Sequence, residues 1–179
     1  MVRDHGLTPL ASLRSGLPPE GSKLARDGSG SPLVARSRYR LPPMLPYNID
    51  HVAIAVTDLD SAIAEFSAQY GAEPISREIV AEQGVEEAMI AVGGSHIQLL
   101  RPLEADSPVG RFLATRGEGL HHLALAVPDL DIALAHLREG GARLVDETPR
   151  IGGGGNRIAF VHPSAFASTL IELVEVKLR

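Results

Sequence analysis

The chain has no cysteine and no tryptophan among its 179 residues, and aromatic residues make up only 4% of it. Without cysteine there are no disulfides, no thiolate metal ligands and no cysteine nucleophile, so any metal must be held by nitrogen and oxygen atoms. No apolar run approaches the roughly 20 residues that span a bilayer, which predicts a soluble protein with no membrane partner. A hydrophobic content of 44% still supplies a core made mostly of Val, Ile, Leu and Ala.

Positive charge is scarce in the larger part of the chain. Residues 44–179 hold ten Lys/Arg against nineteen Asp/Glu, whereas residues 1–43 hold seven against three. The acidic body argues against nucleic acid as a partner. The first segment is rich in Gly, Ser, Pro and Arg and lacks periodicity, so we predict a disordered leader over residues 1–46. We expect a cytoplasmic protein, or a mitochondrial matrix protein if the leader is a transit peptide.

One stretch of the chain occurs twice. Twelve residues that begin at His51 return 71 positions later, beginning at His122, and eight of the twelve pairs are identical. In each copy a histidine opens an apolar run, and the run stops at an Asp-Leu-Asp that is typical of a helix N-terminus. The repetition indicates an internal duplication.

The duplicated pattern predicts two modules with the element order β-α-β-β-β, forming a curved mixed sheet in an α+β fold. We place the whole domain at residues 47–179, with module one at 47–104, a linker at 105–117 and module two at 118–179. A short helix is expected in the linker, at residues 109–115. The predicted strands are 48–56, 73–80, 86–92, 96–100, 119–127, 143–147, 157–161 and 169–176, and the predicted module helices are 59–70 and 130–139.

Four polar residues stand in strands that are otherwise apolar. His51 and His122 open the first strand of each module, and Gln98 and Glu172 occupy matching positions in the last strands. Because side chains alternate along a strand, His51 shares a face with small alanines and leaves room for a ligand. Two imidazoles, an amide oxygen and a carboxylate suit Co²⁺, Mn²⁺, Fe²⁺, Ni²⁺ or Zn²⁺. The pattern therefore predicts a metal site enclosed by the sheet.

From about Tyr47 to Val176 the chain resembles the methylmalonyl-CoA epimerase family of the vicinal oxygen chelate, or glyoxalase-like, superfamily. The paired modules and the four polar residues carry the likeness to the superfamily. The more specific likeness rests on Ile49-Asp50-His51-Val52-Ala53, Glu82-Gln83-Gly84-Val85, Gly119-Leu120-His121-His122, Gly154-Gly155-Asn156-Arg157-Ile158, His162-Pro163 and Leu170-Ile171-Glu172-Leu173.

The resemblance implies an epimerase that acts on methylmalonyl-CoA, and it implies a homodimer. The expected cofactor is a divalent metal, Co²⁺ first, with Mn²⁺, Ni²⁺ or Zn²⁺ as alternatives. The metal ligands would be His51, Gln98, His122 and Glu172, and His121 should point to the other face of its strand.

The resemblance also assigns two catalytic bases, Glu87 and Glu172, one for each face of the carbon that loses its proton. Glu86 is adjacent to Glu87, and strand alternation lets only one of these two face the cavity. Contacts to the substrate are a weaker expectation for Asn156, Arg157 and His96.

Three other functions stay open at this point. A lactoylglutathione lyase of the glyoxalase I type shares the fold, but its residue at the position of Gln98 is typically Glu. A ring-cleaving dioxygenase would hold Fe²⁺ with two histidines and one carboxylate, and Gln98 as a fourth ligand argues against it. A metal-free binding protein of the same fold would not need all four ligand residues.

Overall fold

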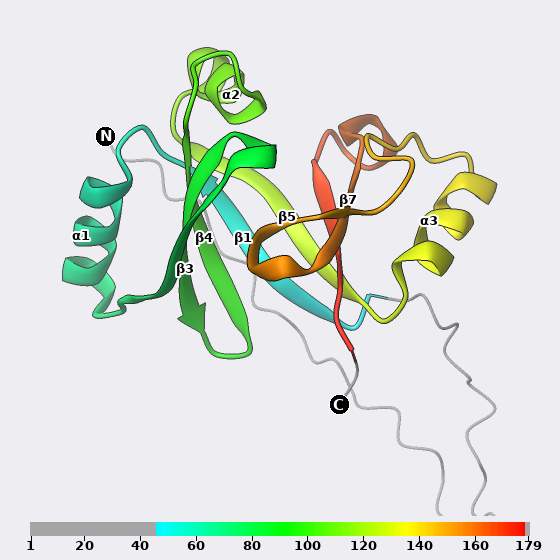
Figure 1. Cartoon of the computed structure of the whole chain (residues 1–179), viewed down its shortest axis with the longest axis horizontal. Helices are drawn as coiled ribbons and strands as arrows, with labels where there is room; N and C mark the ends of the chain where they lie inside the picture. The colour runs from blue at the N-terminus through cyan, green and yellow to red at the C-terminus, as the bar shows by residue number, and fades with distance from the viewer. Residues whose placement is uncertain (1–45, 178–179) are drawn as a thin grey trace, which may run out of the picture. The chain divides into compact units, whose positions relative to one another are not determined.

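A computed structural model of the chain describes residues 46–177. Within that range eight strands form a single sheet, and the β-α-β-β-β order occurs twice, as the sequence predicts (Figure 1). The first module consists of β1 (Asn48–Ala55), α1 (Leu59–Tyr70), β2 (Pro74–Val80), β3 (Val85–Val92) and β4 (Ser95–Pro102). The second consists of β5 (Gly119–Val127), α3 (Leu130–Glu139), β6 (Arg150–Ile151), β7 (Arg157–Val161) and β8 (Ile171–Glu175), with α2 (Pro108–Arg116) between the modules. The predicted leader falls outside the described residues, apart from Pro46.

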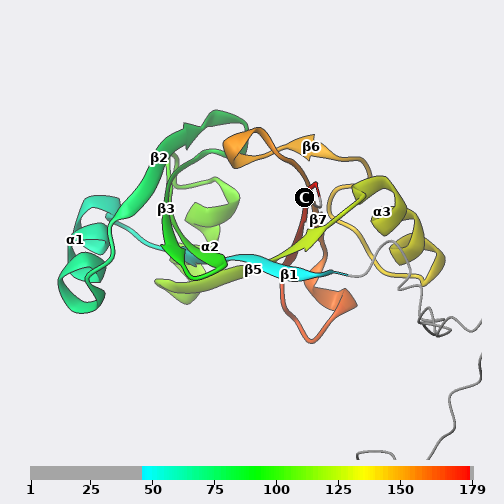
Figure 2. The same ribbon diagram turned by 90° about the horizontal axis from the view of Figure 1, so that it is seen from below.

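The sheet is mixed and strongly curved, as Figure 2 shows, and its strand order is β2-β3-β4-β1-β5-β8-β7-β6. The first strands of the two modules, β1 and β5, pair antiparallel at the centre. Each of them pairs in parallel with the last strand of its own module, β4 or β8. The positions that open and close each module therefore meet in the middle of the sheet. The fold is the predicted α+β arrangement of two modules.

Both module helices begin at an aspartate that caps their free N–H groups. The Asp58 carboxylate accepts from the Ser61 N–H at 2.8 Å, and the Asp129 carboxylate accepts from the Ile132 N–H at 2.9 Å. Such side-chain caps satisfy donors that have no partner inside the helix. The predicted bounds of α1 and α3 are confirmed. Helix α1 ends at Gly71, whose φ of 68° favours glycine.

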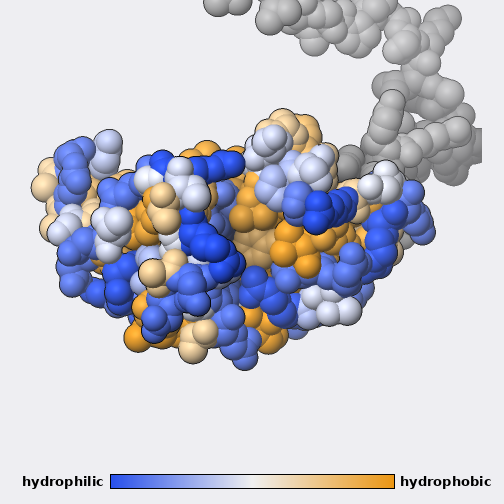
Figure 3. Space-filling model, turned by 90° about the horizontal axis from the view of Figure 1, so that it is seen from above, coloured by the Kyte–Doolittle hydropathy of each residue, from blue (hydrophilic) through white to orange (hydrophobic). Residues whose placement is uncertain are grey.

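The two faces of the sheet differ in the size of their side chains. Ala53, Ala55 and Ala124 are fully buried on the inner face. On the outer face, α1 packs with Ile90 and Leu99, while α3 packs against apolar residues of β5, β7 and β8. The helices thus cover the outside of the curve, and the alanines leave space inside it. The end of the molecule near α2 is mostly hydrophilic, with hydrophobic residues toward its middle (Figure 3).

The strand predicted at residues 143–147 is wrong. Only Leu144 makes a strand bridge there, to Val161, and the edge strand is β6. The side chain of Asp146 explains the break, because it accepts from the Phe160 N–H at 2.8 Å and from Arg150 Nε at 3.2 Å. It takes a place in the ladder that a backbone carbonyl would otherwise fill.

One strand boundary also needs correction. The last strand is predicted over residues 169–176 and is shorter, Ile171–Glu175. Ala167 and Ser168 have positive φ angles, 46° and 59°, which forms a turn just before it. No helix among residues 46–177 is long and apolar enough to cross a membrane.

Candidate metal centre and active site

Three of the predicted ligands meet at the centre of the sheet. His51 on β1, His122 on β5 and Glu172 on β8 are all buried. The His51 Nε2 and His122 Nε2 atoms are 3.2 Å apart, and Glu172 Oε2 lies 3.0 Å from each of them. Neighbouring ligand atoms that sit about 2.1 Å from one ion have separations of this size. The cluster therefore suggests a divalent metal, bound by two imidazoles and a carboxylate.

Gln98 completes the predicted set from the adjacent strand. It is buried on β4, opposite Ala53 of β1, and lines the same cavity as the cluster. Its amide Nε2 donates to Glu87 Oε2 at 2.9 Å. Among the side chains of residues 46–177, its Oε1 is the buried polar atom that has no hydrogen-bond partner. An unpaired buried carbonyl is costly, and a cation would satisfy it, so the donor set fits a metal ion.

A second residue contacts each histidine, and the two sit at matching places in the repeat. Asp50 Oδ1 lies 2.8 Å from His51 Nδ1, and His121 Nδ1 lies 2.9 Å from His122 Nδ1. The register of β1 and β5 shifts at both places, leaving Asp50 and His121 as extra residues. Such β-bulges turn a side chain away from its regular direction. The expectation that His121 points to the other face is therefore wrong, because its ring lies beside that of His122.

Glu87, not Glu86, faces the cavity. Glu87 is 3% exposed and lines the cavity on β3. The neighbouring Glu86 is on the opposite face, where Arg77 Nε at 2.7 Å and Arg101 Nη2 at 2.6 Å bind its carboxylate. Burial, and next the charge of Glu78, raise the pKa of Glu87 to about 7. A carboxyl group with this pKa exchanges protons readily near neutral pH.

The three side chains of the cluster differ in the direction in which their pKa values are shifted. Burial raises the pKa of Glu172, but hydrogen bonds to His122 and His51 outweigh it and lower that pKa to about 2. Burial lowers the pKa of His51, but hydrogen bonds to Asp50 and Glu172 outweigh it and raise that pKa to about 9. His122 lacks a carboxylate like Asp50, and burial lowers its pKa. The metal-free cluster thus pairs an ionised Glu172 with one imidazolium, on His51.

The three weaker predictions differ in where the structure places them. His96 and Asn156 line the cavity, which has a volume of about 200 Å³. Arg157 is not among the lining residues. Its guanidinium binds Asp131 at 2.9 Å and Glu175 at 2.9 Å, close to the start of α3. A larger hollow of about 330 Å³, partly lined by His121, Arg150 and Phe160, shares Gln83 and His122 with the cavity.

Sequence reasoning missed three residues that shape this site: Asp50, Glu78 and Gly153. Asp50 stood beside a predicted ligand, but strict alternation would send its side chain away from His51. Glu78 pairs directly with Glu87 across β2 and β3, and aligning those two predicted strands could have revealed it. Gly153 lies against Glu87, and the run of four glycines signals a close approach of the backbone without showing which residue it meets.

Residues 50–160 match the family model for the Glyoxalase/Bleomycin resistance protein/Dioxygenase superfamily. An ethylmalonyl-CoA/methylmalonyl-CoA epimerase of Cereibacter sphaeroides is 37% identical over 72% of this chain and 97% of its own. The crystal structure of methylmalonyl-CoA epimerase from Mycobacterium tuberculosis is 43% identical, with a TM-score of 0.73, and the match covers 79% of this chain and 95% of that one.

A Streptomyces coelicolor methylmalonyl-CoA epimerase, solved with 2-nitronate-propionyl-CoA, is also similar. It is 41% identical, has a TM-score of 0.71, and is matched over 98% of its length and 74% of this chain. The fold, the histidine and glutamate cluster and these likenesses agree with one another. The chain therefore belongs to the glyoxalase-like superfamily and, within it, to the methylmalonyl-CoA epimerase family.

Proposed function

We propose that the protein interconverts the 2R and 2S forms of methylmalonyl-CoA with the help of a bound divalent metal. The observation that carries this proposal is the meeting of a metal-type cluster with a second buried glutamate, Glu87, in one cavity. The relatives named above bear epimerase names, which favours this reaction over a lactoylglutathione lyase or a metal-free binding protein.

The reaction removes the proton from the carbon between the thioester and the carboxylate and returns one to the opposite face. Two bases are the simplest way to invert such a centre. We assign them to Glu87 from β3 and Glu172 from β8, which belong to different modules. Glu172 contacts both histidines through Oε2 alone. The pKa of Glu87, raised to about 7 by its burial, lets it take up a proton and release it near neutral pH.

His51, Gln98, His122 and Glu172 would hold the metal. When bound, a divalent ion supplies Lewis acidity that stabilises negative charge as it develops on the thioester oxygen. Co²⁺ is our first choice, and Mn²⁺, Ni²⁺ and Zn²⁺ also suit this donor set. His96 and Asn156 line the cavity and would contact the substrate. The assembly we propose is a homodimer, which sedimentation of the purified chain would test.

The proposed reaction is tested by incubating each epimer of methylmalonyl-CoA with the metal-loaded protein in deuterated water. We expect conversion to the other epimer with deuterium at the α-carbon, and loss of both when a chelator is added. Glu87→Gln should bind metal normally but no longer epimerise. If the loaded protein leaves both epimers unchanged and converts the hemithioacetal of methylglyoxal and glutathione, the lyase is correct. If it binds no divalent metal, the binding protein is the better description.

A further inference from the structure

Two glutamates face each other across neighbouring strands at one wall of the cavity. Glu78 of β2 pairs directly with Glu87 of β3, and both line the cavity. Like charges placed directly opposite on a sheet repel one another. Gln98 Nε2 donates to Glu87 from one side. Glu78 is exposed, and its carboxylate accepts from a different donor.

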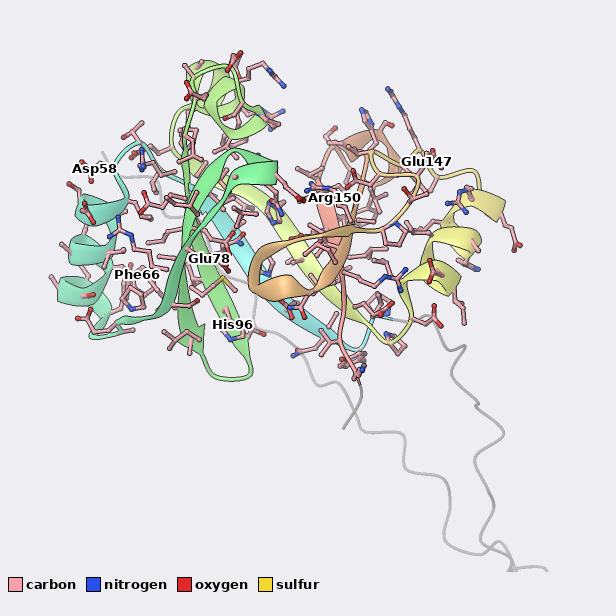
Figure 4. All side chains as sticks on the ribbon, in the orientation of Figure 1. Asp58, Phe66, Glu78, His96, Glu147 and Arg150 are labelled. Carbon is pink, nitrogen blue, oxygen red and sulfur yellow. The ribbon has the colours of Figure 1, made fainter. Side chains whose placement is uncertain are left out.

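That donor comes from the other module. The Gly154 N–H donates to Glu78 Oε1 at 2.8 Å, linking residues that are 76 positions apart in the sequence. Gly154 belongs to a short 3-10 turn, η2 (Gly153–Gly155), between β6 and β7. Figure 4 labels Glu78 on the side of the first module that faces this turn, and Figure 2 shows the turn beside β2. The hydrogen bond therefore joins the two edges of the curved sheet.

The same turn touches the proposed base. A Cβ added at Gly153 would collide with the carboxylate of Glu87, so the backbone lies directly against that carboxylate. Gly154 and Gly155 have φ angles of 63° and 76°, a conformation that favours glycine. The run of glycines lets the turn sit flat against Glu87 while it presents an N–H group to Glu78.

We propose that Glu78 is a positioning residue: by binding the Gly154 N–H, it seats the 152–155 turn against Glu87 and holds the Glu87 carboxylate between that turn and Gln98. The inference rests on the proposed function, because it assumes that Glu87 is one of the two bases. Glu172 is held separately, by His51 and His122. Losing the Glu78 contact should therefore disturb one base and leave the other in place.

An effect on Glu87 alone can be distinguished from general damage to the fold, which would impair both glutamates. In deuterated water, each epimer is deprotonated by the glutamate on its own side, and exchange without inversion needs only that glutamate. We expect Glu78→Ala to slow epimerisation about tenfold, because a small misplacement of the Glu87 carboxylate has a large cost in rate. Exchange should slow about as much for the epimer that Glu87 deprotonates. For the epimer that Glu172 deprotonates, exchange should stay within about twofold of the wild type.

Two further variants separate the hydrogen bond from other effects. Glu78→Gln keeps an oxygen that can accept from Gly154, so it should restore most of the rate lost in Glu78→Ala. Glu73→Ala removes an exposed glutamate just before β2 and controls for the loss of surface charge. Metal content and the thermal unfolding midpoint are measured for each, and we expect both to match the wild type.

Each other outcome counts against the proposal. Equal slowing of exchange for both epimers would show a general structural role. Equal loss in Glu78→Gln and Glu78→Ala would show that charge matters rather than the hydrogen bond. Full activity in Glu78→Ala would show that the contact is not needed. Failure of the wild type to act on either epimer would instead overturn the proposed function, so the two failures are distinguishable.

Discussion

At the scale of single residues, the Nδ1 contacts of the two histidines set how the cluster can bind an ion. Asp50 and His121 lie outside the ligand set, yet each fixes the ring of the histidine next to it. A carboxylate on the far nitrogen of a ligating imidazole orients the ring and makes it a stronger donor. The two contacts are not equivalent, because only Asp50 brings a negative charge.

Replacing Asp50 with alanine should weaken metal binding without removing any ligand. We expect the dissociation constant to rise by about 10- to 100-fold, the usual cost of losing such a partner. Titration of chelator-treated protein against a competing metal indicator measures it. Asp60→Asn is the matched control, because Asp60 is largely exposed and binds Arg77 instead of a histidine. Unchanged affinity in Asp50→Ala would show that the aspartate plays no part in the site.

Glu87 should make the metal-free protein less stable as the pH rises. Its pKa is about 7 in the folded chain, mainly through burial, against an ordinary value of 4.5. The folded state therefore holds this proton more tightly, and stability is lost as the pH rises through about 7. Glu87→Gln cannot ionise, so we expect it to be more stable than the wild type at pH 8 by up to about 3 kcal/mol. The difference should vanish near pH 4.5.

Urea unfolding at pH 8 and pH 4.5, with a chelator present, measures this difference. The chelator matters because a bound cation would also stabilise the ionised carboxylate. Glu139→Gln, at the exposed end of α3, should show no such difference between the two pH values. A wild type that is as stable as Glu87→Gln at pH 8 would contradict the raised pKa.

The ligand residues could be predicted from the sequence because the duplication supplies two aligned copies of one strand. His51 and His122 match in the repeat, and Gln98 matches Glu172. Asp50 and His121, which contact the two histidines, could not be predicted. A bulge at each of them breaks the two-residue period on which the prediction depends. Glu87 needed the family resemblance, since alternation alone could not separate it from Glu86.

At the scale of elements, both modules have an ion pair between corresponding strands, with its charges exchanged. In the first module Glu86 on β3 binds Arg101 on β4, and in the second Arg157 on β7 binds Glu175 on β8. Arg77 and Arg157 then reach Asp60 and Asp131 in the first turns of α1 and α3. Each network ties a helix to the outer side of its sheet half. The guanidinium of Arg157 binds the carboxylates of Asp131 and Glu175 and points away from the cavity.

The glycine turn is the element whose sequence the cavity constrains most. Gly153→Ala places a methyl group where the Glu87 carboxylate lies, so that side chain must move. We expect epimerisation to fall at least about tenfold, because small misplacements of a catalytic group have large costs. Metal binding should be retained, since no ligand is touched. Gly94→Ala is the control, because its added Cβ would meet nothing within 4 Å. A fully active Gly153→Ala would show that Glu87 tolerates displacement.

Element prediction failed where a side chain replaced backbone pairing. Helices α1 and α3 were predictable to the residue because aspartate caps and apolar periodicity agree. The segment around Asp146 reads as a strand in its pattern, but that carboxylate binds the Phe160 N–H and interrupts the ladder. Such a contact forms between segments about 14 residues apart and leaves no periodic signal.

At the scale of the whole molecule, the central pairing of β1 with β5 brings the two copies of the duplicated strand together. His51 and His122 lie on these two strands, and Glu172 joins them through the parallel pairing of β5 with β8. The cluster therefore exists only when both modules are folded and paired. An ion bound there binds the native state and not the unfolded chain, so it must stabilise the fold.

Metal should accordingly raise the thermal unfolding midpoint of the full-length chain. At a free concentration about 100 times the dissociation constant, the gain is about 2.7 kcal/mol, which corresponds to roughly 10 °C for a domain of this size. Scanning calorimetry of chelator-treated protein, with and without Co²⁺, measures the shift. His122→Ala should lose most of it, whereas His136→Ala, which alters an exposed histidine on α3, should keep it. If Co²⁺ raised the unfolding midpoint of His122→Ala as much as that of the wild type, the ion would bind elsewhere. An ion bound between the modules needs a ligand from both β1 and β5.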